Sequence, residues 1–523
     1  MTRGRQKVAV VTGGGGGIGA AVAEELGRGG WFVVTVDPLV TLDGVERLPE
    51  PEETTAGRIN DAGGSARASA ISVTDGEAVS GLFQELVDEH GGLDAVVNVA
   101  GITRPTSFAK GSEEDWLAVL SVHLGGYLNV LEAALPLMAA AGSGHVVGVT
   151  SGSGWRAADA GAYSCAKRAV AALTWQLGRH APEGVTINAM SPIASTRMVT
   201  QALERARPAK GATAGTGGLS LGSMPAPADI GPFGAHLAGD GFGWCNGRVL
   251  FAGGSEVSVI DEPRLLEAVP SDEVASLRRV LDAALPEAFA AAEAAQASTG
   301  GGNPRLGKIF EDVAGGVGAA APVRSCAMAS DRPSLAASLT AALEARSVSC
   351  TALDSPEQLS ARPDMDAIVV APSGDRRDGH GWEGILASHR GMVDRIHADA
   401  AWVRAAAGCN RPVTLVTLID ATTPGGRSRA QASAQLARAA AGSTGGRVTA
   451  FAVSVEAESD RTAGELAANL VTNPDAAGVA GAELAIGAGW IGLRSHPRPI
   501  GSVIYGGSAV PAWLDSALRE IIG

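Results

Sequence analysis

Short apolar, β-branched runs alternate with longer amphipathic segments throughout residues 1–260. The predicted strands are Val8–Thr12, Phe32–Val36, Ala68–Val73, Ala95–Asn98, His145–Thr150 and Thr186–Ala189. The predicted helices between them are Gly19–Gly27, Gly76–His90, Glu113–Ala141 and Ala162–His180. Strands separated by helices of this length predict βαβ units and a doubly wound parallel sheet.

The second half of the chain repeats the same alternation with little shared sequence. Its predicted strands are Val323–Met328, Val348–Leu353, Ala367–Val370, Val413–Ile419 and Val448–Val453. Its predicted helices are Ser334–Ala345, Trp382–Ala407, Ser428–Ala441 and Ala463–Val471. The repeated order predicts an α/β protein with two Rossmann-like, doubly wound parallel-sheet domains in tandem.

A chain of 523 residues is too long for one core and favours two domains. Glu262–Ala297 has an acidic, helical pattern, and Ser298–Pro304 contains the Gly and Pro residues of a break. We therefore predict a first domain at 1–262, a helical linker at 263–304 and a second domain at 305–523.

Two polar segments are unusually long for connections. Pro38–Thr55 is either a surface insertion or part of a site rim. Pro208–Pro227 is rich in Gly, Ala, Ser and Thr, and is either a disordered loop or a mobile flap over the substrate.

Charge and cysteine content exclude several classes of function. The net charge of −14 argues against nucleic-acid and anionic-membrane partners, which require a basic face. The five cysteines are scattered without a CxxC pair, so neither a disulfide framework nor a metal site is expected, and a cytoplasmic protein fits. There is no apolar run of about 18 residues, so no membrane span is expected.

A glycine-rich turn follows the first predicted strand and opens the first helix, in the run from Thr12 to Gly19. Glycines there permit the turn and let a pyrophosphate approach the backbone, while the helix N-terminus offers N–H groups. The predicted cofactor contacts are Gly13, Gly17, Ile18 and Gly19. A merely flexible turn is the alternative.

Asp37 ends the next strand. A carboxylate there accepts hydrogen bonds from the adenosine ribose and repels a 2′-phosphate. No Arg or Lys lies within the glycine turn or directly after Asp37, so the sequence favours NAD over NADP. The alternative is an Asp that caps a loop.

Tyr163 and Lys167 are spaced to lie on one helix face, one turn apart. An ammonium group near a phenol favours the phenolate, which can take a proton from an alcohol while a hydride leaves. Ser151 follows the strand ending at Thr150, where its hydroxyl can face a bound carbonyl. Ser153 is the alternative for that role.

These motifs together resemble the short-chain dehydrogenase/reductase family over about residues 5–260. The resemblance rests on the glycine turn, Asn98-Val99-Ala100-Gly101, Ser151 and the Tyr163/Lys167 pair. A narrower likeness is to the (3R)-hydroxyacyl-CoA dehydrogenase unit of peroxisomal multifunctional enzymes and to actinobacterial relatives. It rests on Asp37 with its following insertion, Val122–Gly126 and Pro192–Met198.

The resemblance implies further site residues. The implied cofactor contacts are Val73, Asn98, Ala100, Gly101, Pro192, Ile193 and Thr196, besides Tyr163 and Lys167. Three positions depart from the family pattern, namely Val99, Ile193 and His123. His123 stands where the family has a catalytic Asn, and its ring could relay protons near neutral pH. A helix histidine without a catalytic role is the alternative.

The second half lacks this chemistry. It has no Tyr before Tyr505, and Val323–Met328 leads into Ala329–Pro333 without a glycine. The second half therefore resembles a short-chain dehydrogenase domain that has lost both its cofactor turn and its catalytic residues.

The sequence predicts an NAD-dependent dehydrogenase that interconverts a secondary alcohol and a ketone. Tyr163 is the acid/base, Lys167 lowers its pKa, and Ser151 orients the substrate oxygen. The likeness implies a 3-hydroxyacyl-CoA-like, steroid-like or alicyclic substrate, and local charge for an anionic one could come from Arg104, Arg156 and Arg197. The alternative is an NAD-binding scaffold or sensor with a vestigial site.

The long helices predict how the two domains associate. Family members pair through two long helices, which here match Glu113–Ala141 and Ala162–His180, with Trp382–Ala407 and Ser428–Ala441 as counterparts. We expect an internal pseudo-dimer in which the second domain replaces a partner subunit, and chains that associate further into a homodimer.

Overall fold

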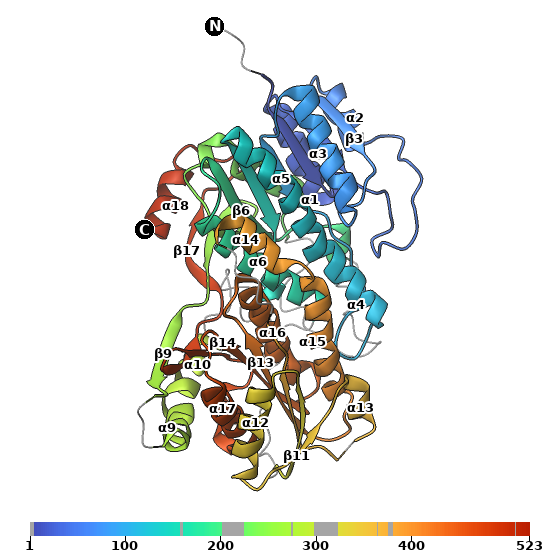
Figure 1. Cartoon of the computed structure of the whole chain (residues 1–523). Coiled ribbons are helices and arrows are strands. Elements are labelled where there is room, and N and C mark those ends of the chain that lie inside the picture. The colour runs from blue at the N-terminus through green and yellow to red at the C-terminus, as the bar shows by residue number, and fades with distance from the viewer. Residues whose placement is uncertain are drawn as a thin grey trace, which may run out of the picture.

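The computed structural model describes residues 5–156, 160–200, 224–272, 276–297, 323–362, 364–374, 380–507 and 509–523. It contains two twisted sheets, each flanked by helices, with a layer of long helices between them (Figure 1). The two predicted Rossmann-like α/β units are confirmed. Most of the predicted flap, 208–223, and the predicted break, 298–304, lie outside the described residues.

The first sheet has nine strands in the order β17-β8-β7-β6-β5-β4-β1-β2-β3. Its strands are β1 (Val8–Thr12), β2 (Phe32–Val36), β3 (Ser65–Ser69), β4 (Ala95–Asn98), β5 (Gly144–Val149), β6 (Val185–Pro192), β7 (Val249–Gly253), β8 (Glu256–Asp261) and β17 (Arg498–Ile504). Strands β1 to β7 are parallel, while β8 and β17 are antiparallel to their neighbours. The valine-rich strand β1 is fully buried, as expected for the centre of such a sheet.

Helices cover both faces of this sheet. They are α1 (Gly17–Arg28), α2 (Thr55–Asp61), α3 (Gly76–His90), α4 (Glu113–Leu120), the π-turn η1 (Ser121–Gly125), α5 (Gly126–Ala141), the 3₁₀ turn η2 (Gly152–Gly154), α6 (Ala162–Arg179), α8 (Pro227–Leu237), the 3₁₀ turn η4 (Asp240–Phe242) and α18 (Leu514–Ile522). The predicted strand Ala68–Val73 begins earlier, as β3, because its polar residues pair with β2 at the sheet edge.

The second sheet has eight strands in the order β11-β10-β12-β13-β14-β15-β16-β9. They are β9 (Leu265–Pro270), β10 (Ser325–Ser330), β11 (Ser349–Ala352), β12 (Ala367–Ala371), β13 (Val413–Asp420), β14 (Val448–Val455), β15 (Glu483–Gly487) and β16 (Trp490–Arg494). The order from β11 to β16 repeats the order of the first sheet from β2 to β8, and among described residues nothing corresponds to β3.

The second sheet also has helices on both faces. They are α9 (Leu277–Ala284), the π-turn η5 (Leu285–Phe289), α10 (Ala290–Ala297), α12 (Pro333–Glu344), α13 (Pro356–Ser360), α14 (Gly381–His389), α15 (Met392–Ala407), α16 (Pro424–Ser443), α17 (Asp460–Thr472) and the 3₁₀ turn η6 (Pro474–Val479).

The two halves of the chain exchange one strand each. After β8 the chain crosses to the second sheet, where β9 pairs with β16, and after β16 it crosses back, where β17 pairs with β8. Figure 1 shows β9 and β17 along the same side of the molecule. The crossing segments bind each other, since Ser495 N donates to the Arg264 carbonyl at 2.7 Å and Arg264 N to the Ser495 hydroxyl at 2.9 Å.

This exchange changes the predicted domain boundaries. The segment 263–304, predicted as a helical linker, contains β9, and its helices α9 and α10 pack on the second domain, with Leu281 and Phe289 in its core. Conversely, β17 and α18 belong to the first domain, where Leu514 and Leu518 join the core around Phe233. Strand pairing across the domains depends on hydrogen bonds between backbone segments that are far apart in the chain. The local pattern of apolar and polar residues does not indicate such pairing.

The predicted packing of long helices across the two domains is confirmed. Helix α6 lies along α16, and α4 and α5 contact α15 and α14 (Figure 1). Both central helices are rich in buried alanine, which allows close approach, and one apolar core continues from Val170 of α6 to Ala437 of α16.

The continuous helix Glu113–Ala141 is a core element of this layer. Within the described part of the chain, it alone has the length and hydropathy of a membrane span, although no apolar run of that length was expected from the sequence. Of its apolar window, 61% is buried inside the protein, which is typical of a core helix.

Candidate functional site

The glycine-rich turn between β1 and α1 is built for close contact with a ligand. Gly13 has a φ of +65°, and a Cβ there would lie 2.9 Å from the Ala100 nitrogen. Gly19 packs so closely that a Cβ would lie 2.2 Å from the Gly13 carbonyl oxygen. At the start of α1, Gly16 provides no side-chain cap and the first turn contains no acid. The helix N-terminus therefore offers N–H groups to an anion, which fits the pyrophosphate of a dinucleotide.

Asp37 folds back over the glycine turn. Its carboxylate accepts hydrogen bonds from Gly15 N at 3.2 Å and Leu39 N at 3.0 Å. Leu39 has a φ of +54°, so the chain turns sharply directly after the carboxylate. Asp37 thus lies beside the glycine turn, as its predicted role requires.

Thr12 and Asn98 join the ends of β1 and β4. The Thr12 hydroxyl donates to the Asn98 side-chain oxygen at 2.8 Å and accepts from Ala100 N at 3.2 Å. The buried Asn98 thereby fixes the Val99–Gly101 segment against the glycine turn. The Asn98 side-chain oxygen is hydrogen-bonded within the protein, so Asn98 would contribute to a cofactor site by positioning this segment.

Ser151, Tyr163 and Lys167 converge at the carboxyl end of β5. The Tyr163 hydroxyl and Ser151 form a hydrogen bond. Ser153 donates to the Ser151 Oγ from its hydroxyl at 3.1 Å and from its backbone N–H at 3.3 Å, so the alternative serine supports Ser151. The Lys167 ammonium donates to the Val149 carbonyl at 2.6 Å and lies 5.6 Å from the centre of the Tyr163 ring.

Burial controls the protonation of this group. It raises the pKa of the Tyr163 hydroxyl, and the hydrogen bond to Ser151 offsets only part of that effect. Burial also lowers the pKa of Lys167 to about 7. The expected lowering of the Tyr163 pKa by Lys167 is therefore not present in this geometry, because desolvation of the phenolate dominates.

His123 lies in the π-turn η1, against the Tyr163 ring. The two rings meet edge to face with their centres 4.9 Å apart. His123 Nε2 lies 2.8 Å from the Ile102 carbonyl oxygen, while Nδ1 is buried with no hydrogen-bond partner among the described residues. Burial, together with the charge of Lys167, lowers the pKa of His123 to about 3. The ring is therefore neutral near pH 7, so a relay through His123 would have to use the neutral ring.

Other predicted contacts occupy the edges of the same region. Val73 is buried against Gly126, and its carbonyl accepts from Asn129 at 2.9 Å. Pro192 ends β6, and Ile193 N continues the sheet by donating to the Ala252 carbonyl at 2.9 Å. The Thr196 hydroxyl accepts from Val199 N at 3.3 Å at the start of the next segment.

Arg197 provides a cation that the local sequence of the turn does not contain. A Cβ built at Gly16 would lie 3.2 Å from an Arg197 Nη atom, and one at Gly17 would lie 3.7 Å from Thr196. The segment after β6 thus lies against the glycine turn, and Arg197 places positive charge where a pyrophosphate would bind.

The polar segment after Asp37 packs along one rim of the site. Thr103 N donates to the Leu42 carbonyl at 2.8 Å, and Arg104 donates to the Asp43 carbonyl at 2.8 Å. Arg104 also forms an ion pair with Asp115 at 3.3 Å. Of the two expectations for Pro38–Thr55, the contacts with Thr103 and Arg104 favour a rim of the candidate site, and Arg104 is engaged within the protein.

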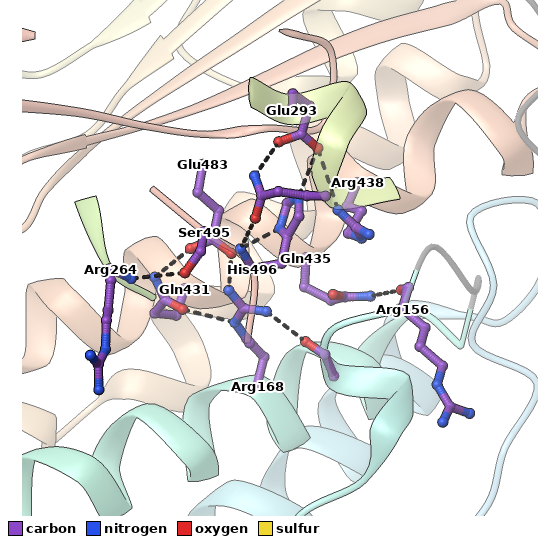
Figure 2. A network of polar contacts seen from close by, with 12 residues as sticks. Arg156, Arg168, Arg264, Glu293, Gln431, Gln435, Arg438, Glu483, Ser495 and His496 are labelled. Carbon is purple, nitrogen blue, oxygen red and sulfur yellow. Dashed lines mark hydrogen bonds and ion pairs between the residues drawn. The ribbon is translucent and has the colours of Figure 1, made fainter. Parts of the chain in front are cut away.

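Residues of the second domain reach the loop after Ser151, which the sequence did not indicate. Arg168, the neighbour of Lys167, pairs with Glu483 of β15, and Gln435 of α16 donates to carbonyls of Ser153 and Arg156 (Figure 2). Glu483 and Gln435 lie in no recognisable motif, so only the packing of the two domains brings them to the site.

The doubly wound sheet and its glycine turn define a dinucleotide-binding α/β protein. The family model for short chain dehydrogenase matches residues 7–207. The short-chain reductase protein NovJ of Streptomyces niveus is 35% identical over 203 residues, which cover 38% of this chain and 74% of that protein. The chain belongs to the short-chain dehydrogenase/reductase family. It is therefore an oxidoreductase of a family that binds nicotinamide cofactors.

Two further comparisons give the extent of the likeness. Peroxisomal multifunctional enzyme A of Dictyostelium discoideum is 33% identical over 196 residues, which are 37% of this chain and 44% of that protein. A solved short chain dehydrogenase from Mycobacterium avium is 30% identical, covering 52% of this chain and 89% of its own, with a TM-score of 0.42.

Proposed function

We propose that the chain is an NAD-dependent dehydrogenase that interconverts a secondary alcohol and a ketone. The observation that carries the proposal is the convergence of Ser151, Tyr163 and Lys167 beside an uncapped helix N-terminus and Asp37. When bound, the nicotinamide supplies the hydride acceptor or donor. The carboxyl ends of the strands are where such folds bind their ligands.

The protein residues handle the proton and the substrate oxygen. Ser151 orients that oxygen by a hydrogen bond, and the Tyr163 hydroxyl exchanges a proton with it. Because burial keeps Tyr163 protonated, it is the acid in the direction of ketone reduction. Lys167 provides a partly charged amine next to the phenol, and the unpartnered Nδ1 of His123 is a further acceptor at this site.

Specific residues support the choice of cofactor. Asp37 beside the glycine turn would accept hydrogen bonds from the adenosine ribose and repel a 2′-phosphate. Arg197, next to Gly16, would meet the pyrophosphate. Val73, Asn98, Ala100, Gly101, Pro192, Ile193 and Thr196 would complete the cofactor site, directly or by fixing its walls.

The narrower likeness supports the choice of substrate class. Trp155, Phe251 and Ile193 form a largely buried apolar cluster with Trp175 near the serine loop. Apolar surroundings of this kind would suit a 3-hydroxyacyl, steroid-like or alicyclic alcohol. We further propose that the enzyme works in the cytoplasm, with its five cysteines reduced, and that two chains form a homodimer.

A panel of secondary alcohols and ketones, assayed with NAD(H) and NADP(H) by absorbance at the nicotinamide band, tests the proposal. The panel should include 3-hydroxyacyl thioesters, hydroxysteroids and cyclohexanols. We expect turnover of at least one class with NAD(H). Tight NAD binding without any turnover would instead support the scaffold or sensor alternative.

A further inference from the structure

The loop between Ser151 and Arg156 is attached to the second domain directly by two of its backbone carbonyls and, through Arg168 of α6, by a third. Gln435 Nε2 donates to the Arg156 carbonyl at 2.8 Å and to the Ser153 carbonyl at 3.1 Å. Arg168 Nη1 donates to the carbonyl of Gly154, which lies between them, at 3.3 Å. Figure 2 shows Gln435 bonded to Arg156, and Arg168 beside Glu483 and Gln431.

The second domain in turn fixes the guanidinium of Arg168. It pairs with Glu483 at the start of β15, and its Nε donates to the Gln431 side chain at 2.8 Å. Gln431 also donates to Glu483 at 3.0 Å, which ties the two acceptors together. The side chains of Arg168 and Glu483 are only 1% and 3% exposed, so water does not compete for this pair.

Glu483 is itself held by a further layer of the second domain. His496 Nδ1 lies 3.1 Å from Glu483, and His496 Nε2 lies 2.7 Å from Glu293 of α10. Arg438 of α16 is 3.6 Å from Glu293. The anchor for the serine loop thus extends through several elements of the second domain, and it is rigid because its members are buried and hydrogen-bonded.

The loop transmits this anchoring directly to the reacting groups. The backbone N–H and the hydroxyl of Ser153 both donate hydrogen bonds to the Ser151 Oγ, and Ser151 is hydrogen-bonded to the Tyr163 hydroxyl. Gly154 packs on the backbone of helix α6, since a Cβ there would lie 3.0 Å from Arg168 N and 3.2 Å from the Lys167 carbonyl carbon. A shift of Ser153 or Gly154 therefore moves the Ser151 hydroxyl relative to Tyr163.

We propose that Gln435 and Glu483 are positioning residues of the active site, although they lie in the domain without catalytic motifs. They hold the Gly152–Arg156 loop, and through it the Ser151 hydroxyl, in the geometry that orients the substrate oxygen. This inference rests on the proposed function of Ser151. It gives the second domain a direct part in turnover, beyond covering apolar surface.

Gln435→Met is the direct test, because it keeps the side-chain length and removes the donor. We expect kcat to fall about ten- to a hundredfold, the scale of a small misplacement of a catalytic group, with NAD affinity within twofold of wild type. Amide hydrogen exchange of residues 150–156 should become faster. The exchange measurement requires no substrate, so it tests the anchoring even if the proposed reaction is wrong.

Ser428→Ala is the matched control. Ser428 lies on the same helix as Gln435 and bonds Gln176 of α6 at 3.0 Å, but it does not contact the serine loop. We expect it to leave kcat and exchange of residues 150–156 unchanged. Equal effects of Gln435→Met and Ser428→Ala would overturn the proposal, because both would then report only a looser interface.

Glu483→Gln is the second variant, in case Gln435→Met does not fold. It replaces the carboxylate by an amide of the same shape and so removes the charge that holds Arg168. We expect a lower kcat with unchanged NAD affinity, and Glu483→Asp should recover part of the loss. Wild-type kcat and wild-type loop exchange in Glu483→Gln would contradict the role of this residue.

Discussion

The two sheets share their strand order but differ in the loops at the carboxyl ends of their strands. In the first domain, residues 150–161 connect β5 to α6 and carry Ser151. In the second domain only residues 421–423 connect β13 to α16, so no loop is present to carry a corresponding serine. The two domains therefore share their strand order, whereas the residues available for chemistry depend on the loops.

The starts of the two central helices show the same difference. Helix α6 is preceded by Gly161, with a φ of +50°, where a Cβ would lie 1.3 Å from the Thr106 carbonyl oxygen. Helix α16 begins with an ordinary cap, in which the Thr423 hydroxyl accepts from Gly426 N at 3.1 Å, followed by Pro424. The first domain uses a turn that requires glycine, whereas the second domain uses a cap that stabilises the helix.

The turns after the first strand of each sheet differ similarly. Four consecutive glycines from Gly13 connect β1 to α1, whereas Asp331 and Arg332 connect β10 to α12. Asp331 binds Ser373, with its carboxylate 2.6 Å from the Ser373 backbone nitrogen, and Arg332 pairs with Asp460 at 2.9 Å. The second domain thus has two charged side chains, each bonded within the domain, where the first domain has glycines.

The largest expected effect is the loss of the acid/base in the first domain. Tyr163→Phe should lower kcat about 10²–10⁴-fold, because proton transfer to the substrate oxygen is lost. NAD affinity, measured by fluorescence titration, should stay near the wild-type value. A kcat within a few-fold of wild type would reject Tyr163 as the acid/base.

The interface between the domains should be sensitive to a single charge. Arg168→Met leaves Glu483 buried without its main partner, which should lower the free energy of unfolding by about 3–5 kcal/mol in urea titrations. The control is Arg179→Met on the same helix, whose pair with Glu262 is exposed and should be worth less than about 1 kcal/mol. Similar losses in both variants would show that burial of the Arg168 pair is energetically unimportant.

The same pair should make the fold sensitive to acid. Burial raises the pKa of Glu483, but Arg168 and His496 outweigh this and lower it from its ordinary value of 4.5 to about 2. The ionised Glu483 therefore stabilises the fold by on the order of 3 kcal/mol. This stabilisation is fully present above about pH 4.5 and is lost as the pH falls to about 2. The urea midpoint of Glu483→Gln should depend less on pH in that window than the wild-type midpoint does.

Asp37 should determine the cofactor preference of the first domain. Asp37→Ala should reduce the discrimination between NAD and NADP by about 1.5–3 kcal/mol, the value of hydrogen bonds to a charged group. The ratio of kcat/KM for the two cofactors measures it. An unchanged ratio would mean that another group excludes the 2′-phosphate.

The smallest expected effect is at the cap of the second domain's central helix. Thr423→Ala removes the bond to Gly426 and should cost about 1 kcal/mol of stability. Turnover should be unchanged, because the cap does not contact the serine loop. A kcat loss as large as that of Gln435→Met would mean that any strain in α16 reaches the site.

Much of the frame and of the catalytic motif could be predicted from local sequence. Strands such as β1 and β12 are short apolar runs bounded by turns, and the spacing of Tyr163 and Lys167 is set by the helix that contains them. The edge strands β9 and β17 were missed, because none of their residues is fully buried and their pairing partners lie far away in the chain.

The protonation states could not be predicted from motifs. The sequence places Lys167 near Tyr163, but burial of the whole group decides the direction of both pKa shifts. Likewise, the pKa of His123 is lowered by its burial in the π-turn and by the charge of Lys167, neither of which its own side chain indicates. Desolvation depends on every element packed around a group, so it exists only in the folded chain.

The sequence by itself determined the two α/β units, the glycine turn, the Ser151–Tyr163–Lys167 set and the lack of equivalents in the second half. These features are local, since each depends on residues within one strand, turn or helix. Only the tertiary structure decided that the halves exchange β9 and β17 and that Gln435 and Glu483 reach the serine loop. Contacts between residues hundreds of positions apart depend on how two finished sheets and their helices pack, and no short pattern in the chain encodes that arrangement.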